Sequence, residues 1–220
     1  MTFIEPTILW IFFCGLIQNT AYAMIAPFLP LKLVELNVSP LAQGIIFAIY
    51  AVAVILFSPA VGTLLKTFNG KTLIWFGMFL MGLCFALFAV IGANLITNPI
   101  LITWYCIALR ILQGISSATM QTTCYAIGAS DFPKKMHFIV GGIEAVTGGG
   151  LILGPLIGSP LHSNYGFRIT YCIAGGSLVI LAAIFACFFP LSGIKEVQIE
   201  EGSEDFVSGD RVNDVNTLQT

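Results

Sequence analysis

Six apolar stretches, each long enough to cross a membrane, limit what this 220-residue chain can fold into. An α-helix needs about 20 apolar residues to cross a hydrocarbon core of about 30 Å. The breaks between the stretches are short and are marked by polar residues, proline or glycine, so that each helix must run antiparallel to the one before. The sequence therefore predicts an all-α integral membrane protein with six transmembrane helices, at residues 7–30, 41–65, 72–95, 99–126, 137–161 and 168–189.

The composition indicates that lipid surrounds most of the chain's apolar surface. Hydrophobic residues make up 57% of the chain and charged residues only 9%, whereas soluble domains carry about 25% charged residues. A soluble globule of this size could not bury so much apolar surface. The net charge of −2 offers no basic footprint, which excludes nucleic acid as a partner.

Charge divides the chain into two parts. Residues 191–220 hold seven acidic and two basic residues, and they are nearly free of aromatic residues. We therefore expect a transmembrane domain at residues 1–190 and an acidic, disordered cytoplasmic tail at residues 191–220.

The basic residues of the short connections predict the orientation, because cytoplasmic loops carry more lysine and arginine. Two connections and the segment after the sixth span form the richer side, and the opposite side has only Lys32 and Arg168. Both termini are therefore predicted to be cytoplasmic, in the plasma membrane or an intracellular vesicle. The lysines on the richer side are Lys66, Lys71, Lys134, Lys135 and Lys195.

The cysteines and histidines give no sign of a metal site or of catalysis. All six cysteines lie inside apolar runs, and none forms a CxxC pair or lies near a histidine at ligand spacing. No HExxH sequence, nucleophile–base pair or pair of aspartates occurs in the spans. We expect no disulfide, metal or cofactor, and no enzymatic activity.

Two ionisable residues lie where lipid should not tolerate them. Arg110 is about 16 Å into the fourth span and Glu144 about 10 Å into the fifth. Since a charge at the bilayer centre costs about 2.5–3.5 kcal/mol on insertion scales, each needs a reason to be there. We interpret Arg110 as a functional residue and Glu144 as a proton carrier. A permanent ion pair between them is the structural alternative for Glu144.

Polar residues also form one face of the fourth span, at intervals of three and four. The first span repeats this pattern halfway along its length. Two helices with polar midpoints indicate a shared cavity for a small solute, although hydrogen bonds that merely hold the bundle together remain the alternative. The cavity candidates are Gln18, Asn19 and Tyr22 on the first span and Gln113, Gln121 and Tyr125 on the fourth. Ser117 shares the polar face of the fourth span with them.

Glycines dominate the fifth span. Gly150, Gly154 and Gly158 are four residues apart and form a smooth ridge that lets another helix approach closely. Pro155 removes a backbone donor within that ridge and should bend the helix. A bent and smooth helix suits a pivoting contact.

Two of these patterns resemble motifs of the major facilitator superfamily. The fourth span contains Arg110-Ile-Leu-Gln113-Gly114-Ile-Ser-Ser-Ala118, which resembles that family's RxxQGxxxA motif. The fifth resembles its antiporter motif, with a serine in place of the final glycine. The residues that carry this second resemblance are Gly141, Gly150, Gly154, Pro155, Gly158 and Ser159.

Two further segments resemble the same family in part. The connection after the second span resembles the family's gate loop at Gly62, Gly70 and Lys71, but Lys66 replaces the acid that helps to latch the gate. The first span is similar to that of vesicular amine and polyamine transporters, except that Gln18 stands at the position of their amine-binding acid. The chain is thus identified as resembling the N-terminal half of a twelve-helix carrier, built as a 3+3 repeat, in the drug and vesicular amine:proton antiporter branch.

The resemblance implies transport by alternating access. We expect a small organic solute, of amine or drug type, to exchange for protons, with Arg110 assisting proton coupling and the segment around Gly150–Pro155 acting as hinge. The superfamily's site lies between two halves, so a missing C-terminal half or a second six-helix chain is the implied partner. The alternative is a non-transporting membrane protein with an assembly or interaction role, which Lys66 at the latch position favours.

Overall fold

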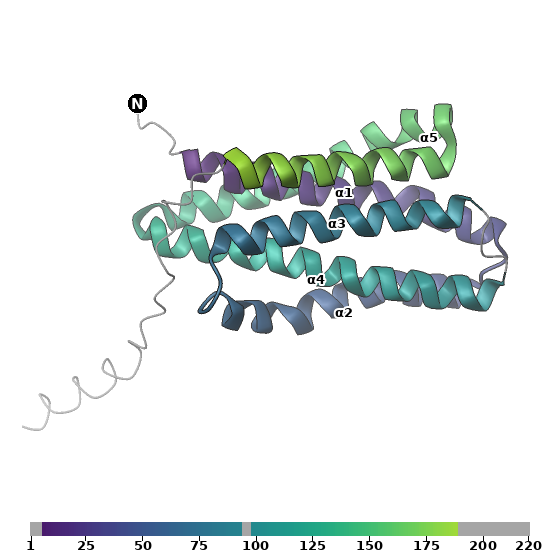
Figure 1. Ribbon diagram of the computed structural model, residues 1–220, viewed down its shortest axis with the longest axis horizontal. Coiled ribbons are helices and arrows are strands. Elements are labelled where there is room, and N and C mark those ends of the chain that lie inside the picture. The colour runs from purple at the N-terminus through teal and green to yellow at the C-terminus, as the bar shows by residue number, and fades with distance from the viewer. Residues whose placement is uncertain (1–5, 94–97, 189–220) are drawn as a thin grey trace, which may run out of the picture.

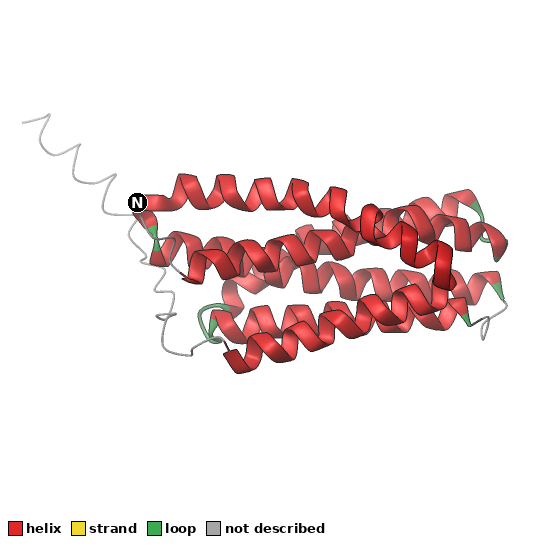
Figure 2. Ribbon diagram, turned by 90° about the horizontal axis from the view of Figure 1, so that it is seen from above, coloured by secondary structure: helices red, strands yellow, loops and turns green. Residues whose placement is uncertain are grey.

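The computed structural model describes residues 6–93 and 98–188, which form a bundle of long helices (Figure 1). The described regular structure is entirely helical (Figure 2). Five of these helices are long and apolar enough to cross a membrane. The helices are α1 (Pro6–Glu35), α2 (Pro40–Leu64), α3 (Gly70–Gly92), α4 (Pro99–Asp131) and α5 (Met136–Phe188), with a short 3₁₀ turn, η1 (Pro133–Lys135), before α5.

The fifth and sixth predicted spans both fall within α5. This helix contains one residue with non-helical backbone angles, Gly166, at φ 71° and ψ 176°. Glycine lacks the Cβ atom that disfavours positive φ, so the chain can reverse there. Figure 1 shows α5 turning back on itself, and the two predicted spans lie on either side of Gly166.

Helix starts follow the sequence closely. Ser39 caps α2 by accepting a hydrogen bond from the backbone N–H of Ala42 (3.3 Å), and Asn98 caps α4 by accepting one from Ile100 (2.9 Å). Proline follows each cap at the first helical position, where its missing N–H costs nothing.

Two helices extend several residues beyond their predicted ends. The first helix was expected to end at Pro30 but continues to Glu35, since a proline in a membrane helix can be accommodated by neighbouring helices. The fourth was expected to end at Ala126 but continues to Asp131. In that last part Gly128 packs against Ile139 of α5, where an added Cβ would lie only 2.9 Å from the side chain. Packing between helices, which hydropathy does not report, sets this boundary.

Small residues allow the closest helix contacts. Gly150, Gly154 and Gly158 of α5 lie against α1, and an added Cβ at Gly154 would be 2.7 Å from the carbonyl oxygen of Thr20. The part of α5 after Gly166 packs on α3 through Gly175, where an added Cβ would be 2.6 Å from the backbone nitrogen of Ala86. Backbones can come this close only where side chains are absent.

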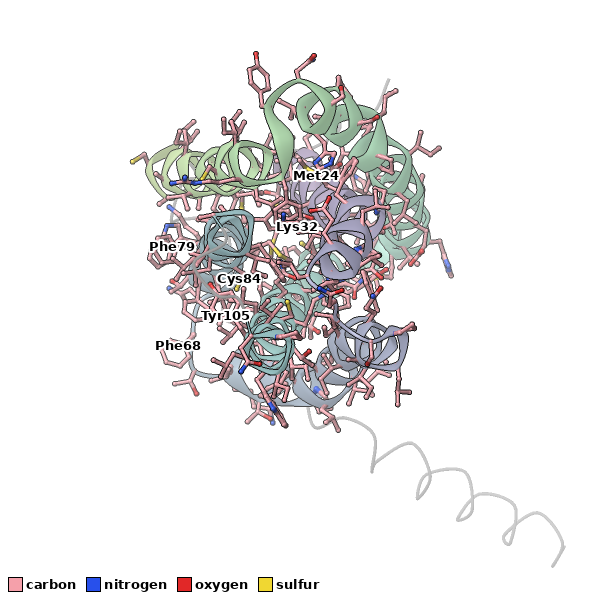
Figure 3. The ribbon with its side chains drawn as sticks, turned by 90° about the vertical axis from the view of Figure 1, so that its right-hand side faces the viewer. Met24, Lys32, Phe68, Phe79, Cys84 and Tyr105 are labelled. Atoms are coloured by element: carbon pink, nitrogen blue, oxygen red, sulfur yellow. The ribbon has the colours of Figure 1, made fainter. Side chains whose placement is uncertain are left out.

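The buried interior has two apolar clusters. One contains Ile8, Ile11 and Cys14 of α1 together with Met120 of α4. The other contains Met24 and Leu29 of α1 together with Ile102 and Leu109 of α4. The two clusters leave a gap in the apolar sequence of both helices, at Gln18 of α1 and between Arg110 and Ser117 of α4. The side-chain view in Figure 3 looks along the bundle, with Met24 and Cys84 in its interior.

Candidate functional site

A polar layer lies between the two apolar clusters. Its members are buried: Gln18 is 4% exposed, Arg110 and Gln113 are each 1% exposed, and Ser117 is 3% exposed. They come from α1 and α4, whose midpoints the antiparallel packing brings together. Polar residues that the sequence placed near the middle of these two spans therefore lie together in the structure.

Ser117 is the centre of a small hydrogen-bond network. The Nε2 group of Gln18 donates to its Oγ atom, and the hydroxyl of Tyr50 on α2 donates to the same atom at 2.8 Å. Tyr50 also stacks on Tyr22, with ring centroids 4.7 Å apart. Three helices therefore meet at one serine.

Arg110 lies beside this network against aromatic rings. Its guanidinium carbon is 4.5 Å from the ring centroid of Phe47 and 5.5 Å from that of Tyr50, within cation–π range. Its NH1 group donates to Oε1 of Gln113 at 3.3 Å. No carboxylate in the described part of the chain pairs with it. The titratable side chains near it are Cys106 and the tyrosines Tyr22, Tyr50 and Tyr171.

Three buried donors in this region have no hydrogen-bond partner within residues 6–93 and 98–188. They are Nε of Arg110, Nε2 of Gln113 and the hydroxyl of Tyr171. Buried polar groups are normally satisfied, and an unpaired one costs about 1–3 kcal/mol. The layer is consequently rich in donors and poor in acceptors.

Glu144 belongs to a separate polar contact. It is exposed on α5, and its carboxylate accepts a hydrogen bond of 2.6 Å from the hydroxyl of Tyr125 on α4. Arg110 and Glu144 do not contact each other. Gln121, one turn before Tyr125, is half-buried.

Asn19 faces α5 rather than the polar layer. Its Nδ2 group donates to the carbonyl oxygen of Gly15 at 2.8 Å and to Oγ1 of Thr147 at 3.2 Å. Of the three candidates on the first span, Gln18 and Tyr22 therefore join the contacts around Ser117, and Asn19 does not.

The glycine ridge of the fifth span contacts α1. An added Cβ at Gly150 would lie 2.7 Å from Cβ of Asn19, and one at Gly158 would lie 2.7 Å from the ring of Phe28. Gly141 is exposed with open space around it, and Pro155 is half-buried. The ridge is thus occupied by a helix of this chain.

The gate-loop residues lie at the connection between α2 and α3. Lys66 is exposed and Lys71 is half-buried in the first turn of α3. Gly70 is buried against α4, where an added Cβ would be 3.1 Å from Ile127, whereas Gly62 has open space around it. The connection and η1 lie at the same end of the bundle (Figure 1).

Sequence reasoning missed the aromatic contribution of α2 and α5. Phe47, Tyr50 and Tyr171 all lie in apolar spans, where an aromatic residue is usually a packing residue. The position of Tyr50 near the middle of its span is the one signal that could have identified it.

Comparison with known proteins agrees with the motifs. The family model described as Major Facilitator Superfamily matches residues 11–212. The MFS-type transporter SLC18B1 of Homo sapiens is 27% identical over 169 residues, which are 77% of this chain and 37% of that protein.

Two bacterial relatives show the same extent of similarity. The multidrug resistance protein MdtG of Yersinia enterocolitica is 28% identical and covers 78% of this chain and 39% of its own length. The multi-drug resistance efflux pump PmrA of Streptococcus pneumoniae is 25% identical, and the matched residues are 80% of this chain and 43% of that protein. The chain spans about two fifths of the length of these relatives. The family model covers most of the chain, and the resemblance seen in the fourth and fifth spans is confirmed: this multi-pass membrane chain belongs to the Major Facilitator Superfamily.

Proposed function

We propose that the chain forms one six-helix half of a carrier that moves a small organic solute by alternating access in exchange for protons. The observation that carries this proposal is Arg110, fully buried beside Gln113 with no carboxylate partner in the described part of the chain. A structural role would not need an unpaired charge at this depth. A role in transport needs such a charge, because a proton or a solute can then pair with Arg110 during part of the cycle.

The solute site of the proposal is the polar layer. Gln18, Gln113 and Ser117 offer hydrogen-bonding groups, while Tyr22 and Tyr50 offer stacked aromatic faces. Amphiphilic solutes need this combination of a few polar groups and apolar walls. The names of MdtG and PmrA, which refer to drug resistance, support a drug-like or amine solute. Asn19 and Gln121 lie at the edge of the proposed site.

Proton coupling is assigned to Arg110 and Glu144. Because the two residues do not contact each other, they would act at different points of the proton path. Glu144 holds a hydroxyl partner, Tyr125, on the adjacent helix, and this pair can pass a proton between α4 and α5.

Topology completes the proposal. At 53 residues α5 would be about 80 Å long if straight, far more than a bilayer core of about 30 Å. We therefore propose that it crosses twice, with the reversal at Gly166, and that six spans form a 3+3 repeat. Both termini, the lysine-bearing connections and the tail at residues 191–220, which lies outside the described residues, are placed in the cytoplasm.

The hinge is assigned to the contact between α1 and α5. Gly150, Gly154 and Gly158 form a smooth surface on which α1 can rock, and Pro155 leaves a backbone carbonyl free nearby. The other half of the carrier would meet the exposed faces of α2 and α5, including Gly141. That half is a further segment of the same protein or a second six-helix chain.

Transport in reconstituted vesicles tests the proposal. Ethidium, an aromatic organic cation, is the probe, and a pH gradient with an acidic interior drives its uptake. The variant is Arg110→Ala, and the matched control is Arg168→Ala, which removes an exposed arginine two residues after the reversal of α5. We expect gradient-dependent uptake that the control keeps and Arg110→Ala loses.

Two outcomes would contradict parts of the proposal. Uptake that persists in Arg110→Ala would remove this residue from the coupling mechanism. A folded and correctly inserted chain that takes up no ethidium would show that this chain alone does not carry that solute. Repeating the assay with the chain joined to a second half would then separate a missing half from a non-transporting protein.

A further inference from the structure

An apolar cavity of about 330 Å³ opens beside the connection between α2 and α3. It lies apart from the polar layer, and its volume is within the range of about 300–1,000 Å³ that small-molecule pockets occupy. Its walls come from the end of α2, the start of α3 and the facing side of α4. Phe57, Val61, Phe68, Trp75, Phe76 and Ile115 form most of these walls.

The mouth of the cavity opens onto the outer surface of the bundle. Phe57, Phe68 and Phe76 are 38%, 50% and 45% exposed. Figure 3 shows Phe68 at the outer edge of the bundle, away from Met24 and Cys84 in the interior. Trp75 is held in place by stacking on Phe79, with ring centroids 5.7 Å apart. In a membrane an apolar opening of this kind faces hydrocarbon.

The turn that borders this cavity carries a positive charge. Residues 64–68 form a tight turn, in which the N–H of Phe68 donates to the carbonyl oxygen of Leu64 at 2.8 Å. Leu64 and Phe68 both line the cavity, and the exposed Lys66 lies between them in the sequence. An exposed cation therefore lies two residues from the cavity lining on either side.

We propose that this cavity binds one acyl chain of an anionic phospholipid whose phosphate pairs with Lys66. An acyl chain suits walls that offer almost no polar atoms, and a phosphate suits an exposed ammonium group at the water boundary. The lysine-rich end of the bundle is the end assigned to the cytoplasm, and the cytoplasmic leaflet carries the anionic lipids. This inference concerns a site other than the solute site and does not depend on transport.

Photolabelling in nanodiscs tests the proposal. The probes are phosphatidylserine and phosphatidylcholine that carry a photoactivatable group in one acyl chain, and labelled peptides are identified by mass spectrometry. We expect the phosphatidylserine probe to label peptides of the α2–α3 region about five-fold more than the phosphatidylcholine probe, which is the preference that one nearby lysine confers.

Two variants separate the apolar and the charged parts of the site. Ala60→Phe places a ring in the cavity and should remove labelling by both probes. Lys66→Gln should abolish the preference for phosphatidylserine and leave labelling by phosphatidylcholine unchanged. The matched controls are Ala51→Phe, at an exposed position of α2 that does not line the cavity, and Lys134→Gln, an exposed lysine at the same end of the bundle. Both controls should behave as the unaltered chain.

Three results would overturn the proposal. Equal labelling by the two probes would exclude recognition of the head group. Unchanged labelling in Ala60→Phe would place the acyl chain elsewhere. Absence of labelling in the α2–α3 region would mean that no phospholipid chain occupies the cavity.

Discussion

The guanidinium of Arg110 is a buried charge whose neighbours are aromatic rings and an amide rather than a carboxylate. Replacing a buried charge with an apolar residue of similar volume often leaves stability unchanged or raises it. We therefore expect Arg110→Met to unfold at the same or a higher temperature than the unaltered chain in detergent. Arg110→Ala should unfold at a lower temperature than Arg110→Met, because it leaves a cavity. If both variants were equally destabilised, the charge itself would be structural.

Ser117 accepts two hydrogen bonds from other helices, and its removal leaves Gln18 and Tyr50 without that partner. We expect Ser117→Ala to lower the free energy of unfolding by about 1 kcal/mol. Adding Tyr50→Phe should cost less in this background than in the unaltered chain, which a double-mutant cycle measures. Ser177→Ala is the control, because Ser177 is exposed and bonds only within its own helix. Equal effects of the two serine substitutions would contradict the network.

Individual residues show how far sequence reasoning could reach. Spacing placed Arg110, Gln113 and Ser117 on one face, and all three are buried in the polar layer. Spacing could not reveal that Asn19 turns toward Thr147, because neighbouring residues on a helix point in different directions and only packing decides which direction is interior. It also could not anticipate the partner of Glu144, since that contact depends on how α4 and α5 are aligned.

The contact between α1 and α5 depends on missing side chains. An added Cβ at Gly154 would lie 2.7 Å from the carbonyl oxygen of Thr20 and 2.8 Å from the backbone nitrogen of Met24, and neither atom belongs to a flexible side chain. We expect Gly154→Ala to destabilise the chain by about 2 kcal/mol, a typical cost of overpacking, in thermal unfolding. Gly148→Ala is the control, because Gly148 lies on the same helix with open space around it. The explanation fails if the two substitutions have the same effect.

The existence of the helices was easier to predict than their ends. The break expected at residues 162–167 contains Gly166, whose positive φ only glycine adopts readily. The backbone on both sides of this residue stays helical. Hydropathy reports whether a segment is apolar but not where a turn begins. Residues 162–167 look like a polar break, yet only Gly166 has non-helical backbone angles.

The bundle as a whole has its lysine-bearing connections at one end and the reversal of α5 at the other (Figure 1). If α5 crosses the membrane twice, the reversal must face away from the cytoplasm while both of its neighbouring connections face the cytoplasm. Single cysteines report this with a membrane-impermeant maleimide. In cells that carry the chain in the plasma membrane, we expect Ser163→Cys to be labelled without permeabilisation. Lys134→Cys and Ser203→Cys should be labelled only after permeabilisation, with the unaltered chain giving the background of its native cysteines.

The labelling pattern distinguishes the possible topologies. A single crossing by α5 would place positions 134 and 203 on opposite sides, so that one of them would be labelled in intact cells. An inverted bundle would label both of these positions and protect position 163. Each span reverses the side of the membrane on which the following connection lies. Only two crossings by α5 with cytoplasmic termini therefore protect positions 134 and 203 from the reagent and leave position 163 accessible.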